Sequence, residues 1–332
     1  MCDREQHVRG SFRTISSIES MSKILVTGAN GFVGSSLCEN LHLRGLDFAP
    51  AVRKASLKGQ VSVGDLSPDT DWAEALIGCD AVIHLAARVH VMNDSANDPL
   101  AAFRAVNLDA TLNLARQALS AGAKRFVFVS SIKVNGEETD SVPFTAFDQA
   151  APVDPYGQSK LEAETALKAL AQTTDLELVI VRPPLVYGPG VRANFRRLMQ
   201  LVKMGVPLPL GAIHNRRSMV AVDNLVDLLI LCSRHPAASG QIFMVSDDHD
   251  VGISELLRML AAAMGKRSVL LPFPSSLIAG TAAVFGKSAV ASRLLGSLQV
   301  DINHTKATLR WQPPVSMELS LKKTVADYLA HS

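Results

Sequence analysis

Tyr156 and Lys160 stand four residues apart in the segment "DPYGQSK", residues 154–160. Asp154 can cap a helix and Pro155 suits its first turn, so the tyrosine and the lysine would share one helix face. A free tyrosine has a pKa of about 10, and a neighbouring ammonium favours the phenolate. The spacing therefore suits a phenol that exchanges protons near neutral pH. A plain helix face that happens to carry these two residues is the alternative.

Ser131 ends the apolar run "RFVFVSS", residues 125–131, which is typical of a buried strand. Open α/β sheets bind ligands at the carboxyl ends of their strands. A hydroxyl at that place would hold a substrate oxygen beside a phenol. Ser131, Tyr156 and Lys160 are therefore the predicted catalytic residues.

Three glycines, Gly28, Gly31 and Gly34, recur at a spacing of three in "TGANGFVG", directly after the strand-like run "KILVT". A glycine turn between a strand and a helix brings backbone N–H groups and a helix N-terminus towards an anion. The helix-like run "SSLCENLHLRG" that follows favours a dinucleotide pyrophosphate site over an ordinary strand–helix turn. The spacing GxxGxxG differs from the GxGxxG of most dehydrogenases.

The second strand, expected at residues 47–52, ends in "AVRK", with Arg53 and Lys54 in the place of an acidic residue. An acid at this point hydrogen-bonds the ribose of NAD, whereas a basic residue accommodates the 2′-phosphate of NADP. NADP(H) is therefore favoured, while NAD(H) and a merely solvated basic loop stay open. Asp65, in "GDL" after the third strand, is expected to meet the adenine edge.

Apolar, strand-like runs alternate with helical patterns over the first half of the chain. Further strands are expected at residues 61–64, 81–86, 125–130 and 176–182. Helices are expected at residues 72–77, 101–121 and 159–172. This alternation predicts an α/β fold, a Rossmann-type doubly wound parallel sheet with right-handed crossovers.

Pro and Gly become frequent after residue 183, which predicts a smaller C-terminal substrate-binding lobe over residues 184–332. The dinucleotide-binding domain would then cover residues 21–183. The run "QIFMVS", residues 241–246, is a candidate strand that returns to the main sheet. Residues 1–20 are polar and lack the apolar core of a secretory signal, so they are expected to form a disordered tail.

The chain has 332 residues, 48% of them hydrophobic, and a formal net charge of +2. Such a small charge gives no field that favours nucleic acid or a membrane surface. The apolar segment 275–300 is interrupted by charged residues, so it is expected to pack as helix rather than to insert into a membrane. The four cysteines are scattered, which is typical of free thiols in a cytoplasmic protein and predicts no metal site.

The chain resembles the extended short-chain dehydrogenase/reductase family, specifically its nucleotide-sugar epimerase/dehydratase/reductase group. Besides the motifs above, the resemblance rests on "HLAA", "VNLDATLNL", "VSSIKVNG", "RPPLVYGPG" and "RRSMVAVDNLVD". Within the group, the chain is similar to the bacterial UDP-N-acetylquinovosamine dehydrogenase type, which reduces a UDP-4-keto-6-deoxy-N-acetylhexosamine in surface-polysaccharide synthesis. The resemblance therefore implies an NAD(P)H-dependent UDP-sugar 4-keto reductase that forms a homodimer.

The resemblance also implies a role for each matching position. The implied cofactor contacts are Gly28, Gly31, Phe32, Val33, Gly34, Arg53, Lys54, Asp65, Leu66, Leu85, Ala86, Ala87, Tyr156, Lys160 and Pro183. Lys160 would in addition lower the pKa of Tyr156. The implied substrate contacts are Ser131, Lys133, Asn194, Arg216, Arg217 and Arg293. A solvated surface charge is the alternative for Lys133 and for each of these arginines.

Two departures from the family's patterns bear on the reaction. The sugar-nucleotide 4,6-dehydratases carry an Asp-Glu pair after the serine, where this chain has Ile132 and Lys133, so dehydration is rejected. The hexose epimerases usually have Tyr and Asn where this chain has Asn135 and Leu185. This weakens a UDP-hexose 4-epimerase with retained NAD, which nevertheless stays the alternative. A non-catalytic protein on the same fold is disfavoured by the intact catalytic residues.

Overall fold

The computed structural model describes residues 23–89, 98–274, 277–278, 280 and 294–332. The expectations for the tail at 1–20, for most of the segment 275–300 and for Arg293 lie outside these residues. No helix in the described ranges is long and apolar enough to cross a membrane. Within the same ranges, no three or more His, Cys, Asp and Glu side chains are grouped so that they could hold a metal ion.

The main sheet has seven strands in the order β3-β2-β1-β4-β5-β6-β9, and every pair is parallel. The strands are β1 (Lys23–Thr27), β2 (Phe48–Val52), β3 (Val61–Ser62), β4 (Cys79–His84), β5 (Arg125–Val129), β6 (Glu177–Arg182) and β9 (Ile242–Met244). The central strands are almost wholly buried, as continuous apolar runs require. The predicted Rossmann-type sheet is confirmed, and its strand order reverses between β1 and β4, where such sheets bind ligands.

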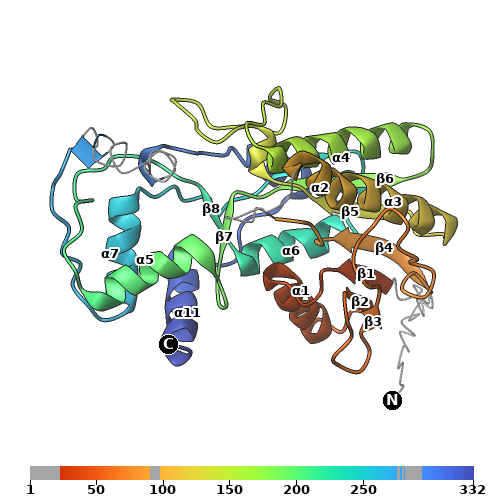
Figure 1. Cartoon of the computed structure of the whole chain (residues 1–332), viewed down its shortest axis with the longest axis horizontal. Coiled ribbons are helices and arrows are strands. Elements are labelled where there is room, and N and C mark those ends of the chain that lie inside the picture. Colours follow the sequence, from red (N-terminus) through yellow and green to blue (C-terminus); the bar gives the residue numbers. More distant parts are fainter. Residues whose placement is uncertain (1–22, 90–97, 275–276, 279, 281–293) are drawn as a thin grey trace, which may run out of the picture.

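Helices cover both faces of this sheet (Figure 1). The helices on one face are α1 (Phe32–Leu43) and α6 (Val222–Cys232), and those on the other are α2 (Pro99–Arg104), α3 (Ala110–Ser120) and α4 (Pro155–Gln172). A π-helical turn, η1 (Ala105–Asp109), joins α2 to α3. The pattern expected as one helix over residues 101–121 is thus one helical run with a widened turn in it.

The helix expected at residues 72–77 is wrong, because the structure has only turns there. The backbone N–H of Leu76 reaches the carbonyl of Trp72 at 3.0 Å, which closes a single helical turn. Gly78 follows with φ +69° and directs the chain into β4 one residue later. So short a segment cannot repay the cost of starting a helix.

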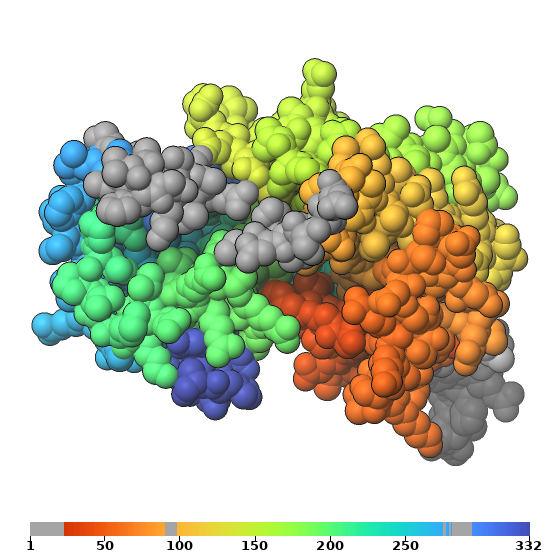
Figure 2. Space-filling view, viewed as in Figure 1, coloured from red at the N-terminus to blue at the C-terminus, as the bar shows by residue number. Residues whose placement is uncertain are grey.

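The C-terminal half of the chain builds a smaller lobe and also returns to the sheet. The elements of the lobe are β7 (Leu185–Tyr187), β8 (Met219–Ala221), α5 (Ala193–Met204), α7 (Ile253–Ala263) and α11 (Met317–Ala330). β9 pairs with β6, α6 packs beside α1, and α10 (Asn303–Leu309) packs on β9. The two halves therefore share one core. On the surface, the atoms near α5 and those near α1 face each other across a hollow (Figure 2).

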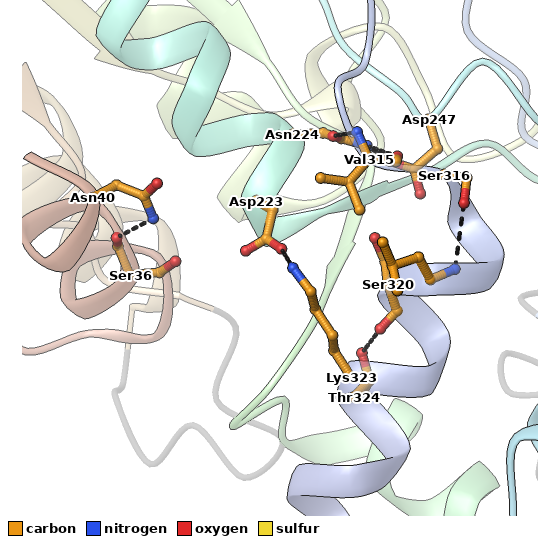
Figure 3. Close-up of polar contacts among 11 residues, drawn as sticks. Ser36, Asn40, Asp223, Asn224, Asp247, Val315, Ser316, Ser320, Lys323 and Thr324 are labelled. Atoms are coloured by element: carbon orange, nitrogen blue, oxygen red, sulfur yellow. Dashed lines mark hydrogen bonds and ion pairs between the residues drawn. The ribbon is translucent and has the colours of Figure 1, made fainter. Parts of the chain in front are cut away.

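A buried polar cluster fixes this lobe to the sheet. Asp247 accepts hydrogen bonds from the Tyr187 hydroxyl at 2.6 Å, the Asn224 amide at 2.7 Å and the Ala221 backbone N–H at 2.8 Å. Asn224 also exchanges two hydrogen bonds with the backbone of Val315, which leads into α11 (Figure 3). We call Tyr187, Asp247 and Asn224 the Tyr187 cluster.

Candidate active site

The glycine turn lies at the carboxyl end of β1, and its geometry requires glycine. Gly28 has φ +67°, and a Cβ there would lie 3.0 Å from the backbone nitrogen of Ala86. A Cβ on Gly34 would lie 2.1 Å from the carbonyl oxygen of Gly28, so only glycine lets α1 pack against the turn. The close approach of three backbone segments is what this spacing of glycines achieves.

The N-terminus of α1 is shaped for an anion. Gly31 is its N-cap and offers no side chain to the first backbone N–H groups, and no acidic residue lies in the first turn. Phe32 and Val33, which open the helix, are half-buried. The positive end of the helix dipole and its free N–H groups therefore fit a pyrophosphate.

Arg53 and Asp65, both expected to contact the adenosine part of the cofactor, are paired with each other. The Arg53 Nε to Asp65 Oδ1 distance is 2.7 Å, and the side chains are 78% and 84% exposed. An ion pair this exposed stabilises by about 0–1 kcal/mol, so Arg53 can exchange Asp65 for a phosphate at little cost. Lys54 is exposed beside it, and Leu66 packs on the core below.

Thr27, the last residue of β1, holds the backbone that follows β4. Its hydroxyl accepts hydrogen bonds from the backbone N–H groups of Leu85 and Ala86, both at 3.1 Å. The buried ring of His84 lies 2.7 Å from Thr27 Oγ1 and 2.9 Å from Thr111 Oγ1. Burial lowers the pKa of His84 to about 3, so the ring is neutral. The stretch expected to run along the cofactor is thereby fixed beside the glycine turn.

Ser131 follows β5 and caps a single 3₁₀ turn, η2 (Ile132–Val134). Its hydroxyl oxygen accepts a hydrogen bond from the backbone N–H of Lys133 at 3.2 Å. The carbonyl of Pro183, just past β6, accepts one from the N–H of Ile132 at 3.0 Å. The ends of two adjacent strands therefore hold this turn at the carboxyl edge of the sheet.

Tyr156 lies in the first turn of α4, which Asp154 caps with a 2.7 Å hydrogen bond to a backbone N–H. The half-buried ring packs edge-on against Phe103, with 6.0 Å between centroids. The Ser131 side chain lies close enough to the Tyr156 hydroxyl to influence its pKa. Burial raises the pKa of Tyr156 to about 12, the charge of Asp154 adds to the rise, and the nearby Ser131 hydroxyl opposes it. The structure thus brings the predicted serine and tyrosine together.

Lys160 lies one helical turn further along α4 and is only 2% exposed. Its Nζ donates to the backbone carbonyl of Val129 at 2.9 Å and lies 4.5 Å from the centroid of the Phe128 ring. Burial lowers the pKa of Lys160 to about 7, against the charge of Glu164. The expectation that this ammonium lowers the pKa of Tyr156 is therefore not met in this structure, because burial of the phenol dominates.

A buried ion pair supports the Ser131 turn from below. Arg182 Nε donates to Glu164 at 2.9 Å, and Arg182 Nη1 donates to the amide oxygen of Asn135 at 3.0 Å. All three side chains are 3% exposed or less. Asn135 therefore does not face a substrate, and its difference from the tyrosine of the hexose epimerases no longer counts against epimerisation.

Lys133 and Arg217, both expected to contact substrate, face carboxylates of this chain. Lys133 Nζ pairs with Glu137 at 2.8 Å and with Asp154. Burial lowers the pKa of the Arg217 guanidinium, and the nearby Glu138 and Glu137 oppose this. The charges of both residues are thus balanced within the protein.

Asn194 and Arg216 are exposed residues of the C-terminal lobe. Asn194 lies in the first turn of α5, and Arg216 comes shortly before β8. The backbone N–H of Arg216 donates to the Ser297 hydroxyl at 3.0 Å. Among the contacts of the described residues, none joins these two side chains to Ser131 or Tyr156. Their role in substrate binding stays a prediction.

Asn107, for which no role was predicted, links two segments beside the site. It lies fully buried in the π-helical turn, and its amide exchanges hydrogen bonds of 2.8 and 3.1 Å with the backbone of Arg88. It also donates to the hydroxyl of Ser159 at 3.0 Å, directly before Lys160. The signal was present in "VNLDATLNL", where a polar amide interrupts an apolar helical pattern.

Comparison with known proteins identifies the family of the chain. The NAD dependent epimerase/dehydratase family matches residues 24–246. The chain is 48% identical to a UDP-glucose 4-epimerase of Vibrio cholerae, over 92% of this chain and 95% of that relative. It is 28% identical to an N-acetyl-alpha-D-glucosaminyl-diphospho-ditrans,octacis-undecaprenol 4-epimerase of Escherichia coli O157:H7, over 77% of each.

Solved structures share the fold at lower identity. A UDP-glucose 4-epimerase with UDP-glucose from Thermotoga maritima has a TM-score of 0.73 and 23% identity. RMD from Pseudomonas aeruginosa complexed with NADPH has a TM-score of 0.72 and 23% identity. Both comparisons cover 93% of this chain and 99% of the other. The fold is that of the short-chain dehydrogenase/reductase superfamily. The chain belongs to the NAD dependent epimerase/dehydratase family, which confirms the resemblance found in the sequence at the level of the family.

Proposed function

We propose that this protein transfers hydride between a nicotinamide dinucleotide and C4 of a UDP-linked sugar. The observation that carries this proposal is the placement of Ser131 beside Tyr156 at the carboxyl edge of the sheet. This is the edge where open α/β sheets bind ligands. A UDP-sugar substrate is supported by the name of the Vibrio cholerae relative, which aligns with 92% of this chain.

The residues around the glycine turn fit a dinucleotide cofactor, which supplies the hydride when bound. The backbone from Gly28 to Gly34 would hold the pyrophosphate, and residues 85–87 would run along the nicotinamide ribose. Arg53 and Lys54 would meet a 2′-phosphate, because no acidic residue follows β2 directly. We therefore propose NADP(H) as the preferred cofactor, with NAD(H) as the alternative.

In the reduction direction, Tyr156 would act as the general acid that protonates the C4 oxygen. Burial keeps the phenol protonated at neutral pH, since its pKa is raised to about 12. Ser131 would orient the same oxygen through its hydroxyl. Lys160, whose pKa burial lowers to about 7, would support the tyrosine and bind the nicotinamide ribose.

Our first candidate reaction is the reduction of UDP-4-keto-6-deoxy-N-acetylglucosamine to UDP-N-acetylquinovosamine or its C4 epimer, in surface-polysaccharide synthesis. It is supported by the basic residues after β2 and by the protonated state of Tyr156. The second candidate is a UDP-hexose 4-epimerase with retained NAD. It is supported by the 48% identical relative and by the burial of Asn135, which removes one argument against it.

One assay separates the two candidates. Purified protein is mixed with NADPH or NADH and UDP-4-keto-6-deoxy-N-acetylglucosamine, and the near-ultraviolet absorbance of the reduced nicotinamide is followed. The reductase predicts rapid oxidation, faster with NADPH, and loss of the rate in Tyr156→Phe. No oxidation, together with conversion of UDP-glucose or UDP-N-acetylglucosamine to its C4 epimer without added cofactor, would replace the reductase with the epimerase.

A further inference from the structure

We propose that Lys133 is a positioning residue whose ammonium clamps the Ser131 turn to the start of α4 and balances the charge of Asp154 beside Tyr156. The inference deepens the proposed function and rests on it for its activity readout. It replaces the substrate contact that the resemblance implies for Lys133.

The ion pairs of Lys133 join two segments of the site. Its Nζ lies 2.8 Å from the Glu137 carboxylate and also pairs with Asp154, the N-cap of α4. The three side chains are 27%, 26% and 16% exposed, so solvent screens these pairs less than it would screen surface pairs. Asp154 meanwhile caps the helix with its other oxygen at 2.7 Å, so one carboxylate holds both segments.

Two backbone contacts also hold the η2 turn, which carries Ser131, against the start of α4. We call this contact the turn–helix joint. A Cβ on Gly157 would lie 2.7 Å from the carbonyl oxygen of Lys133, so α4 approaches the η2 turn as closely as glycine allows. The N–H of Ala151 donates to the carbonyl of Val134 at 3.0 Å. Because the turn carries Ser131 and the helix carries Tyr156, this joint sets the distance between their hydroxyls.

The clamp also decides the charge that Tyr156 experiences. Among the described residues, the charged groups on the elements packed around the tyrosine include Asp154, Lys133, Glu137, Lys160 and Arg88. Glu162 and Glu164 of α4 pair with Arg104 and Arg182. Lys160 is directed at a backbone carbonyl, and Arg88 lies beyond the Phe103 ring, 5.6 Å from its centroid. Asp154 raises the pKa of Tyr156, and Lys133 is the cation that pairs with Asp154. Removal of the Lys133 charge therefore favours the protonated phenol further.

The test is a double-mutant cycle of Lys133→Met and Asp154→Asn, with Lys133→Arg as the charge-retaining control. Asparagine caps a helix as well as aspartate does, so Asp154→Asn keeps α4 intact. We expect the alkaline limb of the pH–rate profile to lie at higher pH in Lys133→Met and at lower pH in Asp154→Asn than in wild type. The double variant and Lys133→Arg should return close to the wild-type limb.

Two outcomes would overturn the inference. A raised KM with an unmoved pH limb in Lys133→Met would make Lys133 a substrate contact. An equal loss of kcat at every pH, without recovery in the double variant, would reduce it to a structural role.

A second readout needs no substrate. The phenolate absorbance of Tyr156 is obtained as the difference between each variant and the same variant carrying Tyr156→Phe. We expect Asp154→Asn to form phenolate at lower pH than wild type and Lys133→Met to form less of it at any pH. These shifts without turnover of a UDP-sugar would refute the proposed function and keep the clamp. Turnover of a UDP-sugar without these shifts would keep the proposed function and refute the clamp.

Discussion

Tyr156 and Tyr187 are two tyrosines whose pKa is raised first of all by burial, yet their surroundings differ. The Tyr187 hydroxyl is wholly inside the protein and donates to Asp247 at 2.6 Å. Tyr156 is half-buried, and its hydroxyl lies near Ser131 at the edge of the sheet. A raised pKa therefore does not by itself mark a reactive tyrosine.

The two tyrosines differ in whether their partner groups are still accessible to a ligand. Asp247 accepts from three donors of this chain, and both Asp247 and Tyr187 are buried, so the Tyr187 cluster is closed off from a ligand. Ser131 and Tyr156 lie near each other at the edge where parallel sheets bind ligands. A closed polar network holds the fold, whereas an open pair at the sheet edge is suited to chemistry.

The two tyrosines should differ most strongly in activity when each is replaced by phenylalanine. Tyr156→Phe removes the proposed general acid and is expected to lower kcat by about 10²–10⁴-fold. Tyr187→Phe should leave kcat nearly unchanged, because its hydroxyl serves only Asp247. Steady-state kinetics of both purified variants measure this. Equal losses in the two variants would show that the distinction between the clusters is false.

Disruption of the buried ion pair between Arg182 and Glu164, which lies beneath Ser131, should lower the free energy of unfolding strongly. Glu164→Gln leaves the buried Arg182 guanidinium without its counter-charge and should lower the free energy of unfolding by about 3–5 kcal/mol. Urea unfolding followed by fluorescence gives this value. The exposed pair of Arg53 and Asp65 provides the matched control, since Arg53→Ala should cost about 1 kcal/mol or less.

Disruption of the Tyr187 cluster should change the free energy of unfolding and leave the activity nearly unchanged. Tyr187→Phe leaves an Asp247 oxygen buried without its donor and should cost about 1–3 kcal/mol in the free energy of unfolding. Tyr156→Phe, whose partner is Ser131 at the sheet edge, should cost less. If Tyr156→Phe proves the more destabilising of the two, the half-buried site would be structural after all.

The last effect, small over any single pH unit, is a pH dependence of stability caused by Lys160. Its pKa is about 7 in the folded protein and 10.5 as the ordinary value, so between these pH values the unfolded state binds the extra proton. This residue therefore makes the free energy of unfolding rise with pH, by about 1.4 kcal/mol per unit inside the window. The difference between wild type and Lys160→Met isolates the slope. An identical slope in both would place the Lys160 pKa near its ordinary value.

Much of the fold could be predicted, because the strands of a buried parallel sheet appear in the sequence as continuous apolar runs. The pairing of Ser131 with Tyr156 also followed, since strand ends and helix starts meet at one edge. What could not be predicted were the partners of charged residues. Lys133 meets Asp154 across 21 positions, and Tyr187 meets Asp247 across 60. Nothing in local spacing encodes such contacts, which arise only when separate elements pack together in the folded protein.

The most direct test of the central claim follows hydride itself. The protein is incubated with UDP-4-keto-6-deoxy-N-acetylglucosamine and a reduced cofactor that carries deuterium at the nicotinamide C4, and the sugar is examined by NMR. We expect deuterium at C4 of the sugar, formed by wild type and lost in Tyr156→Phe. Deuterium at another carbon, or equal incorporation by the Tyr156→Phe variant, would contradict the site proposed here.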